Sequence, residues 1–179
     1  MTDALVATPS QTVGPYVSIG LLRELVPTAL AAAEDPAAIR VYGRLFDGAG
    51  EPVPDGMIEI WQADRDGRYG TEAFSGFGRS GTEDAGRFEF VTVKPGRVPW
   101  PDGGLQAPHL AVGIFARGLL KRVVTRLYFP DEIDANGEDP VLTALSPAQR
   151  GSLVAVPEGD GLCFDIHLQG PSQTTFFAV

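Results

Sequence analysis

The chain has 179 residues, of which 44% are hydrophobic and 21% are charged, and its formal net charge is −9. This length suits one domain with its own core, and the composition is that of a globular protein. A strongly acidic chain repels the phosphates of DNA and RNA, so we exclude nucleic acid as a partner. The single cysteine, Cys163, rules out a disulfide within the chain.

No part of the sequence resembles a signal peptide or a membrane helix. The first ten residues lack a basic region and an apolar region. No apolar run approaches the roughly 18 residues that a membrane helix needs. We therefore expect a cytoplasmic protein that does not bind a membrane.

The first 38 residues differ from the rest in composition, because they lack the alternation of apolar and polar residues that is typical of strands. Residues 8–16, TPSQTVGPY, hold too many turn formers for a helix or a central strand. Residues 1–20 are therefore predicted to form an arm that lies on a surface. Residues 21–38 are rich in Leu and Ala, but Pro27 interrupts them. We expect a helical turn there, followed by a short helix that ends before Pro36.

From residue 39 onward the sequence predicts short strands separated by turns. Alternation of apolar and polar residues is the main signal, and it is clearest at 162–169. Residues 68–86 are glycine-rich and short of aliphatic residues, so they are predicted to form a loop, as are residues 134–140. The strands are expected at 39–46, 57–63, 87–93, 109–117, 122–129, 162–169 and 174–179.

The segment Ser146-Pro147-Ala148-Gln149 has the residues of a helix start, with Ser as N-cap, Pro at the first helical position and Gln at the capping-box position. It predicts one short helix that ends near residue 154. Seven or eight short strands with almost no helix are typical of an antiparallel β-sandwich. We predict an all-β fold of two sheets, as one domain over 1–179 with an arm at 1–38 and the sandwich at 39–179.

The first candidate for chemistry is His109. A long loop rich in Pro and Gly ends at this histidine, which opens an apolar strand. A β scaffold usually presents a metal or substrate site in this way. A metal site would require a second histidine two residues later, on the same face, but that residue is Ala111. His109 is therefore either part of an incomplete metal site or a histidine that bonds to its own loop.

The second candidate is the pair Asp165 and His167, which share one face of a strand because they are two residues apart. A carboxylate and an imidazole in this arrangement could begin an iron site of two histidines and one carboxylate. The pair could equally lie on the solvated outer face of a sandwich strand. The sequence has no Gly-x-Ser-x-Gly motif and therefore gives no sign of a serine nucleophile.

Several motifs along the whole chain together resemble the intradiol ring-cleavage dioxygenases. The resemblance implies an all-β sandwich and a non-haem Fe(III) enzyme whose metal is held by two tyrosinates and two histidines. It implies that the ferric ion binds a catechol dianion, that O2 attacks the ring, and that the ring opens between its two hydroxyl-bearing carbons. The motifs are TPSQTVGPY (8–16), IEIWQAD (58–64), GRY (67–69), VKPG (93–96), APH (107–109), RLYF (126–129) and FDIHLQG (164–170).

The same resemblance reveals departures from the iron-binding members. Those members carry a Pro-Gly-x-Tyr-Pro-Trp loop, whose tyrosine is a ligand, and a His-x-His pair. Here Val98 stands in place of the tyrosine, and Ala111 replaces the second histidine of the pair that begins at His109. The other ligand tyrosine has no clear counterpart after Tyr69. An alkyl group cannot donate to iron, so we expect vestigial metal-site positions and no Fe(III) or oxidoreductase activity in this chain alone.

Within the family, the chain resembles the alpha chains of members built from homologous alpha and beta chains. This implies a hetero-oligomer of alpha–beta pairs, in which the partner beta subunit binds Fe(III) and the substrates are protocatechuate and O2. It also implies that the alpha arm borders the beta pocket. We therefore expect Thr12, Gly14, Pro15 and Tyr16 in the pocket wall, and Arg117 at the interface, where an arginine can serve the carboxylate of the substrate.

Two other interpretations remain open. The chain could bind a metal by itself, through His109, His167 and carboxylates, and act as a self-sufficient enzyme. It could also be a solitary β-sandwich that binds a ligand or has a structural role, without a catalytic partner.

Overall fold

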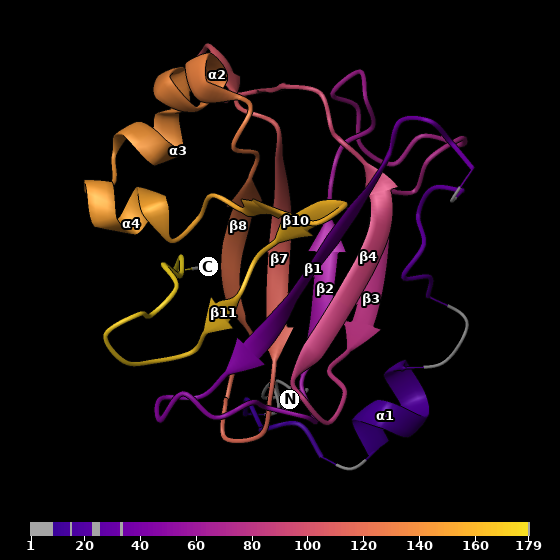
Figure 1. The fold of residues 1–179 in the computed structure, drawn as a ribbon, viewed down its shortest axis with the longest axis vertical. Coiled ribbons are helices and arrows are strands. Elements are labelled where there is room, and N and C mark those ends of the chain that lie inside the picture. The colour runs from indigo at the N-terminus through magenta and orange to yellow at the C-terminus, as the bar shows by residue number, and fades with distance from the viewer. Residues whose placement is uncertain (1–8, 15, 23–25, 33, 179) are drawn as a thin grey trace, which may run out of the picture.

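The computed structural model describes residues 9–14, 16–22, 26–32 and 34–178 (Figure 1). Two β-sheets pack face to face, and three short helices lie together at one side. The predicted all-β sandwich with little helix is confirmed. The strands are β1 (Ala38–Phe46), β2 (Met57–Trp61), β3 (Phe77–Gly81), β4 (Arg87–Val93), β5 (Val98–Pro99), β6 (Leu105–Gln106), β7 (His109–Phe115), β8 (Val123–Tyr128), β9 (Val156–Glu158), β10 (Gly161–Cys163) and β11 (Ile166–His167), and the helices are α1 (Tyr16–Leu21), α2 (Ile133–Glu138), α3 (Pro140–Thr143) and α4 (Pro147–Gly151).

The first sheet is built around β1. Strand β4 pairs with one edge of β1 in antiparallel orientation. Strands β10 and β11 pair one after the other with its opposite edge, in parallel, and β9 follows beyond β10. The second sheet has the order β3-β2-β7-β8 and is antiparallel throughout. A small ribbon of β5 and β6 leads into β7.

The core fills the space between the two sheets. Alternate residues of the longer strands β1, β2, β4 and β7 point into it, as the period-two pattern of the sequence predicts. β1 contributes Val41 and Leu45, and the facing strand β7 contributes Leu110, Val112 and Ile114, all of them buried. The opposite faces of these strands are therefore left for polar groups and for the candidate site.

The predicted strand at 162–169 is divided into β10 and β11. Between them, Phe164 lies so close to β1 that a Cβ at Gly43 would be 2.1 Å from its carbonyl oxygen. The next residue, Asp165, uses its side chain rather than its backbone to accept a hydrogen bond from the Arg44 amide, at 2.9 Å. The ladder with β1 is broken at this point and resumes at β11.

The prediction for the first 38 residues was wrong in its local structure. A helix that was not predicted forms at Tyr16–Leu21, beginning at the last residue of the segment 8–16, whose described residues 9–14 are non-helical as expected. The Leu- and Ala-rich segment forms no helix in its described part. Instead, Ala29 bridges to Val91, and the amide of Leu30 donates to the Val91 carbonyl at 2.7 Å. This segment forms backbone hydrogen bonds with the open edge of β4 instead of a helix, and its amino-acid composition does not indicate that pairing.

Three other local predictions also need correction. Residues 77–81, predicted as loop, form β3 because five residue pairs join them to β2. Residues 133–143 form α2 and α3, where a loop was predicted over 134–140. The predicted last strand is reduced, in its described part, to one bridge between Phe177 and Val124. The helix at residue 147 is confirmed with its capping box, although it ends at Gly151.

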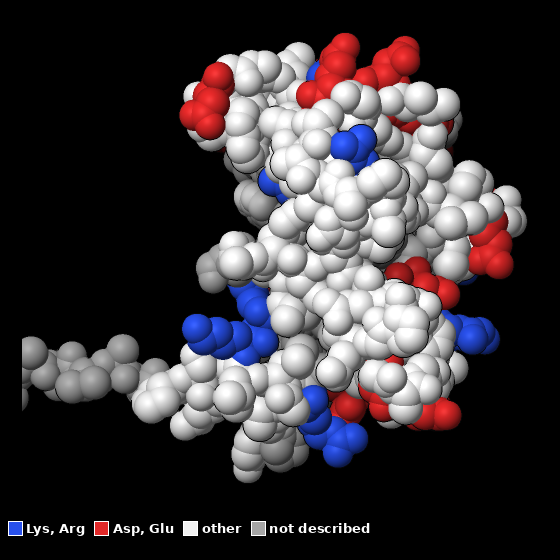
Figure 2. All heavy atoms as spheres, turned by 90° about the vertical axis from the view of Figure 1, so that its left-hand side faces the viewer, with Lys and Arg blue, Asp and Glu red and all other residues white. Residues whose placement is uncertain are grey.

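The side of the molecule that carries α2, α3 and α4 is largely uncharged, with Asp and Glu gathered mainly at its upper edge and its lower right, and a few Lys and Arg scattered between them (Figure 2). The negative charge of the chain is therefore unevenly distributed over this face. Among the described residues, no helix is long and apolar enough to span a membrane.

Candidate functional site

The three positions expected to be vestigial lie around the start of β7. His109 and Ala111 project from the same face of β7, since they are two residues apart in a strand. Val98 is buried in β5 and pairs with Gln106 of β6, from which the chain runs directly into β7. The outer face of the β3-β2-β7-β8 sheet therefore carries this candidate site.

His109 is almost fully buried, with 4% of its surface exposed. Its Nδ1 lies 2.8 Å from the carbonyl oxygen of Ala107, so Nδ1 carries the proton and donates it. Burial, aided by the positive charge of Arg126, lowers the pKa of His109 to about 4. The imidazole is therefore neutral at pH 7 and bonded to its own loop, as one of the two interpretations predicted.

Arg126 and Tyr128 of β8 stand beside His109. The Nη1 atom of Arg126 donates to the Gln106 Oε1 at 2.8 Å and to the Tyr128 hydroxyl at 3.1 Å. The ring of Tyr128 is fully buried and lies 5.6 Å from the His109 ring, centroid to centroid. Burial raises the pKa of Tyr128 above the ordinary range of a phenol, so this hydroxyl stays protonated.

Asp139 is a buried carboxylate that ties the helical side of the molecule to the candidate site. Its Oδ2 accepts from the Ala107 amide at 2.7 Å, and its Oδ1 accepts from the amides of Val141 and Leu142 at 2.8 and 2.9 Å. The Tyr128 hydroxyl adds a contact of 3.3 Å. One side chain therefore caps α3 and fixes the loop on which His109 is mounted.

Two aromatic residues border the site on the side of β2. Trp61 pairs in register with Ala111 and stacks on Tyr69, with ring centroids 5.7 Å apart. Both rings are partly exposed, Trp61 by 42% and Tyr69 by 41%. Burial raises the pKa of the Tyr69 phenol above its ordinary value.

The side chains present do not fit Fe(III). Val98 and Ala111 have no donor atom, so the Nε2 of His109 is the one metal donor that these three positions offer. Arg126 adds a positive charge where a metal would need anionic ligands. Among the described residues, no three His, Cys, Asp or Glu side chains lie close enough to hold a metal ion.

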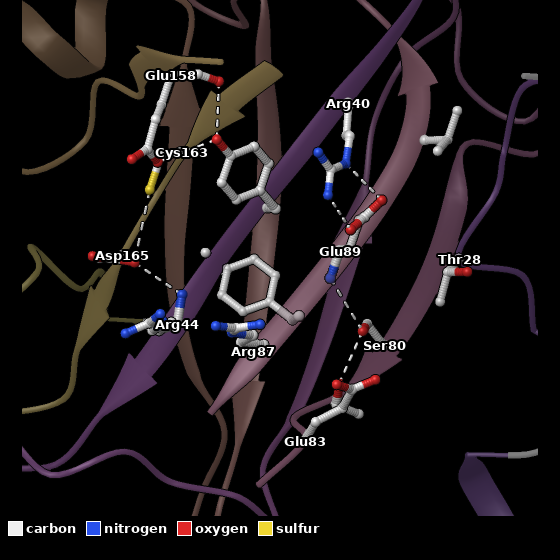
Figure 3. A pocket seen from close by; sticks show the side chains of 15 residues that line it. Thr28, Arg40, Arg44, Ser80, Glu83, Arg87, Glu89, Glu158, Cys163 and Asp165 are labelled. Atoms are coloured by element: carbon white, nitrogen blue, oxygen red, sulfur yellow. Dashed lines mark hydrogen bonds and ion pairs between the residues drawn. The ribbon is translucent and has the colours of Figure 1, made fainter. Parts of the chain in front are cut away.

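The interpretation as a self-sufficient metal enzyme is not supported. His167 lies in β11, in the other sheet, where its ring stacks on Phe46 at 4.8 Å. Asp165 lies in a depression of about 910 Å³ on the outer side of β1 and β4 (Figure 3). The structure does not bring either of them to His109.

The depression is lined by charged side chains, and some of them are paired with one another. Arg40 holds Glu89 through two hydrogen bonds of 2.8 and 2.9 Å, and the Tyr42 hydroxyl donates to Glu158 (Figure 3). Burial raises the pKa of Cys163 to about 11. This thiol is therefore protonated at neutral pH and is a poor nucleophile.

The residues expected to serve a partner lie at the opposite end of β7 from His109. The loop that follows β7 contains Arg117 and Gly118, and the Gly118 amide donates to the Thr12 hydroxyl at 2.9 Å. Arg117 forms an ion pair with Asp55, and 74% of its side chain is exposed. The structure therefore brings Thr12 next to Arg117, 105 positions away in the sequence.

The rest of the arm is less tightly connected. Gly14 accepts a hydrogen bond from the Val17 amide at 3.1 Å, at the start of α1. Tyr16 is the first residue of α1 and is 77% exposed. Pro15, which was expected in the same group, lies outside the described residues.

Arg126, Gln106 and Asp139 were not recognised as site residues from the sequence. For Asp139 a signal existed, because Asp before Pro140 is an N-cap followed by a proline at the first helical position. Arg126 and Gln106 carry no local signal, since their contact joins two strands 20 residues apart.

The buried neutral state of His109 predicts a dependence of stability on pH. Its pKa is about 4 in the folded chain and 6.5 in the absence of burial, so the unfolded chain binds more protons between these values. Stability should therefore fall as the pH falls from 6.5 to 4, by about 2 kcal/mol between pH 7 and pH 5. Urea denaturation at both pH values measures this loss. The His109→Gln variant should lack it, and an equal loss in the variant would contradict the prediction.

Comparison with known proteins agrees with this architecture. A family model described as Dioxygenase matches residues 23–170. The chain is 42% identical to the protocatechuate 3,4-dioxygenase alpha chain of Pseudomonas putida over 98% of both chains. It is 33% identical to the protocatechuate 3,4-dioxygenase beta chain of Burkholderia cepacia, over 76% of this chain and 66% of that chain.

A solved structure shares the fold over nearly its whole length. The dioxygenase domain of a dioxygenase carbohydrate-binding protein fusion from Streptomyces sp. SirexAA-E has a TM-score of 0.63 to this chain and is 26% identical, over 91% of this chain and 99% of that one. The family match, the near-complete coverage by the relatives and the shared β-sandwich lead to one conclusion: the chain belongs to the intradiol dioxygenase family.

Proposed function

We propose that this chain is the alpha subunit of a protocatechuate 3,4-dioxygenase. With a homologous, iron-bearing beta subunit it would cleave protocatechuate with O2 between the two hydroxyl-bearing carbons, giving 3-carboxy-cis,cis-muconate. The observation that carries the proposal is the 42% identity to an alpha chain over nearly the whole length. Similarity to a beta chain at 33% identity supports a pair of homologous subunits.

In this proposal Fe(III) belongs to the beta subunit. The donor set around His109 supports that division, because Val98 and Ala111 cannot coordinate a metal and Arg126 would repel one. The alpha chain then serves the reaction by shaping the partner's pocket and by forming the interface. Pairs of this kind would assemble into larger closed oligomers.

The arm and the loop after β7 are the proposed contribution to the partner's pocket. The hydrogen bond from Gly118 to Thr12 supports this, since it holds the arm beside Arg117. Exposed apolar side chains in the same segments, Tyr16 at 77% and Leu120 at 67%, support a contact with another chain. Arg117 is exposed enough to reach a substrate carboxylate or to position groups that do.

Co-expression tests the proposal. The partner should be a homologous chain that carries Pro-Gly-x-Tyr-Pro-Trp and His-x-His. The expected result is a stable complex with one iron per alpha–beta pair, a ferric-tyrosinate absorption band in the visible range, and O2 uptake when protocatechuate is added. The alpha chain purified alone should show none of these properties.

Two outcomes would contradict the proposal. Stoichiometric iron and O2 uptake in the chain purified alone would identify a self-sufficient enzyme. A failure to form a complex with such a beta chain would favour a solitary β-sandwich without a catalytic partner.

A further inference from the structure

The vestigial site contains a fixed positive charge. Arg126 pairs in register with Ala111, so its side chain leaves the sheet on the face that also carries His109. This is the face from which two histidines would project if residue 111 were a histidine. The side chain of Arg126 therefore begins next to position 111, where the second histidine is absent.

Arg126 is connected to the cross-strand partners of all three vestigial positions, Val98, His109 and Ala111. Its Nη1 donates at 2.8 Å to the Oε1 of Gln106, which is the register partner of Val98. The same atom donates at 3.1 Å to the hydroxyl of Tyr128, which is the register partner of His109. Ala111 is the register partner of Arg126 itself. The guanidinium thus lies among the positions where ligands have been lost.

Within the described part of the chain no carboxylate pairs directly with this guanidinium, and Asp139 is linked to it through the Tyr128 hydroxyl. No carboxylate of a described residue lies within 4.0 Å of it. The nearby carboxylate of Asp139 accepts from three backbone amides instead.

We propose that Arg126 is the built-in cation of this site: it takes the place of a metal ion and keeps metal ions out. A second cation within a few ångströms of the guanidinium would be repelled strongly at the low effective dielectric of a partly buried site. The guanidinium also joins β6 to β8 by its hydrogen bonds, as a shared metal would join them by coordination. Restoring the lost ligands would therefore not restore metal binding while Arg126 remains. This inference does not depend on the substrate or the partner of the chain.

The test restores ligands with and without the cation in the full-length chain. The double variant Val98→Tyr, Ala111→His retains Arg126, and two triple variants add Arg126→Gln or Arg126→Lys. Titration with Co²⁺, followed by its visible absorption, gives the dissociation constant of each variant, and circular dichroism checks folding. We expect the triple variant with glutamine to bind one Co²⁺ per chain, at least about 100-fold more tightly than the double variant.

The triple variant with Arg126→Lys tests whether the positive charge or the planar guanidinium is responsible for weak Co²⁺ binding. It keeps the positive charge but loses the planar hydrogen-bonding group, so it should bind Co²⁺ as weakly as the double variant. Equal binding by the lysine and glutamine variants, or by the double and glutamine variants, would overturn the proposal. So would the absence of Co²⁺ binding in a folded glutamine variant. If the glutamine variant does not fold, Arg126→Met provides a second neutral side chain of similar length.

Discussion

Replacing Asp139 by alanine is expected to lower the free energy of unfolding by about 3–5 kcal/mol. The carboxylate is fully buried and accepts from the amides of Ala107, Val141 and Leu142. Its removal would leave these buried donors unsatisfied and would uncap α3. Because a domain of this size is stabilised by only about 5–15 kcal/mol in total, this loss would be severe. Urea denaturation at pH 7 measures it.

Asp134→Ala is the matched control for this prediction. Asp134 is also acidic and lies in the first turn of α2, but it is exposed. Its replacement should change the free energy of unfolding by no more than about 0.5 kcal/mol. Asp139→Asn should give an intermediate loss, because the side-chain oxygen can still cap α3 while the amide group faces the Ala107 amide, donor to donor. A loss below about 1 kcal/mol in Asp139→Ala would show that the backbone amides find other partners.

Deleting residues 1–16 is expected to raise the Michaelis constant of the assembled alpha–beta enzyme for protocatechuate at least about tenfold, which corresponds to about 1.4 kcal/mol of binding. The arm is the proposed wall of the partner's pocket, and Thr12 is hydrogen-bonded beside Arg117. The turnover number should change much less, because the arm provides no reacting group. The sandwich should remain folded, since the core consists of residues outside the arm. Steady-state O2 uptake measures both constants.

Deletion of residues 1–8 alone is the control, because it retains Thr12 and the residues that follow it. A finer pair is Thr12→Val, which removes the acceptor for the Gly118 amide, and Thr12→Ser, which retains it. Valine should reproduce part of the increase in the Michaelis constant, and serine should not. Unchanged kinetics after the deletion of residues 1–16 would refute the role of the arm.

These two predictions concern opposite ends of β7. At one end, Asp139 and Arg126 hold the candidate site together by buried and partly buried polar contacts. At the other end, Thr12 and Arg117 lie at an exposed surface. The division agrees with the proposal that this chain binds no iron of its own and acts on the site of its partner.

The sequence by itself determined the parts of this protein that depend on local pattern. Alternation of apolar residues was sufficient for β1 and β4, and the Ser146 capping box was sufficient for α4, because burial on one face and satisfaction of the first helical amides are local requirements. The resemblance to the iron-binding family members also predicted that donors are absent at Val98 and Ala111, since an alkyl group cannot coordinate a metal in any fold.

Only the tertiary structure decided the features that depend on distant partners. Residues 77–81 form β3 because they pair with β2 in an antiparallel ladder. Ala29 forms a bridge with Val91 of β4, which lies far from it in the sequence. Arg126 meets Gln106 across 20 residues, and Asp139 meets Ala107 across 32. A local pattern records whether a residue is buried, but not which buried group it will contact. For that reason the absence of donor atoms at Val98 and Ala111 could be read from the sequence, whereas the position of Arg126 beside them became evident only in the folded chain.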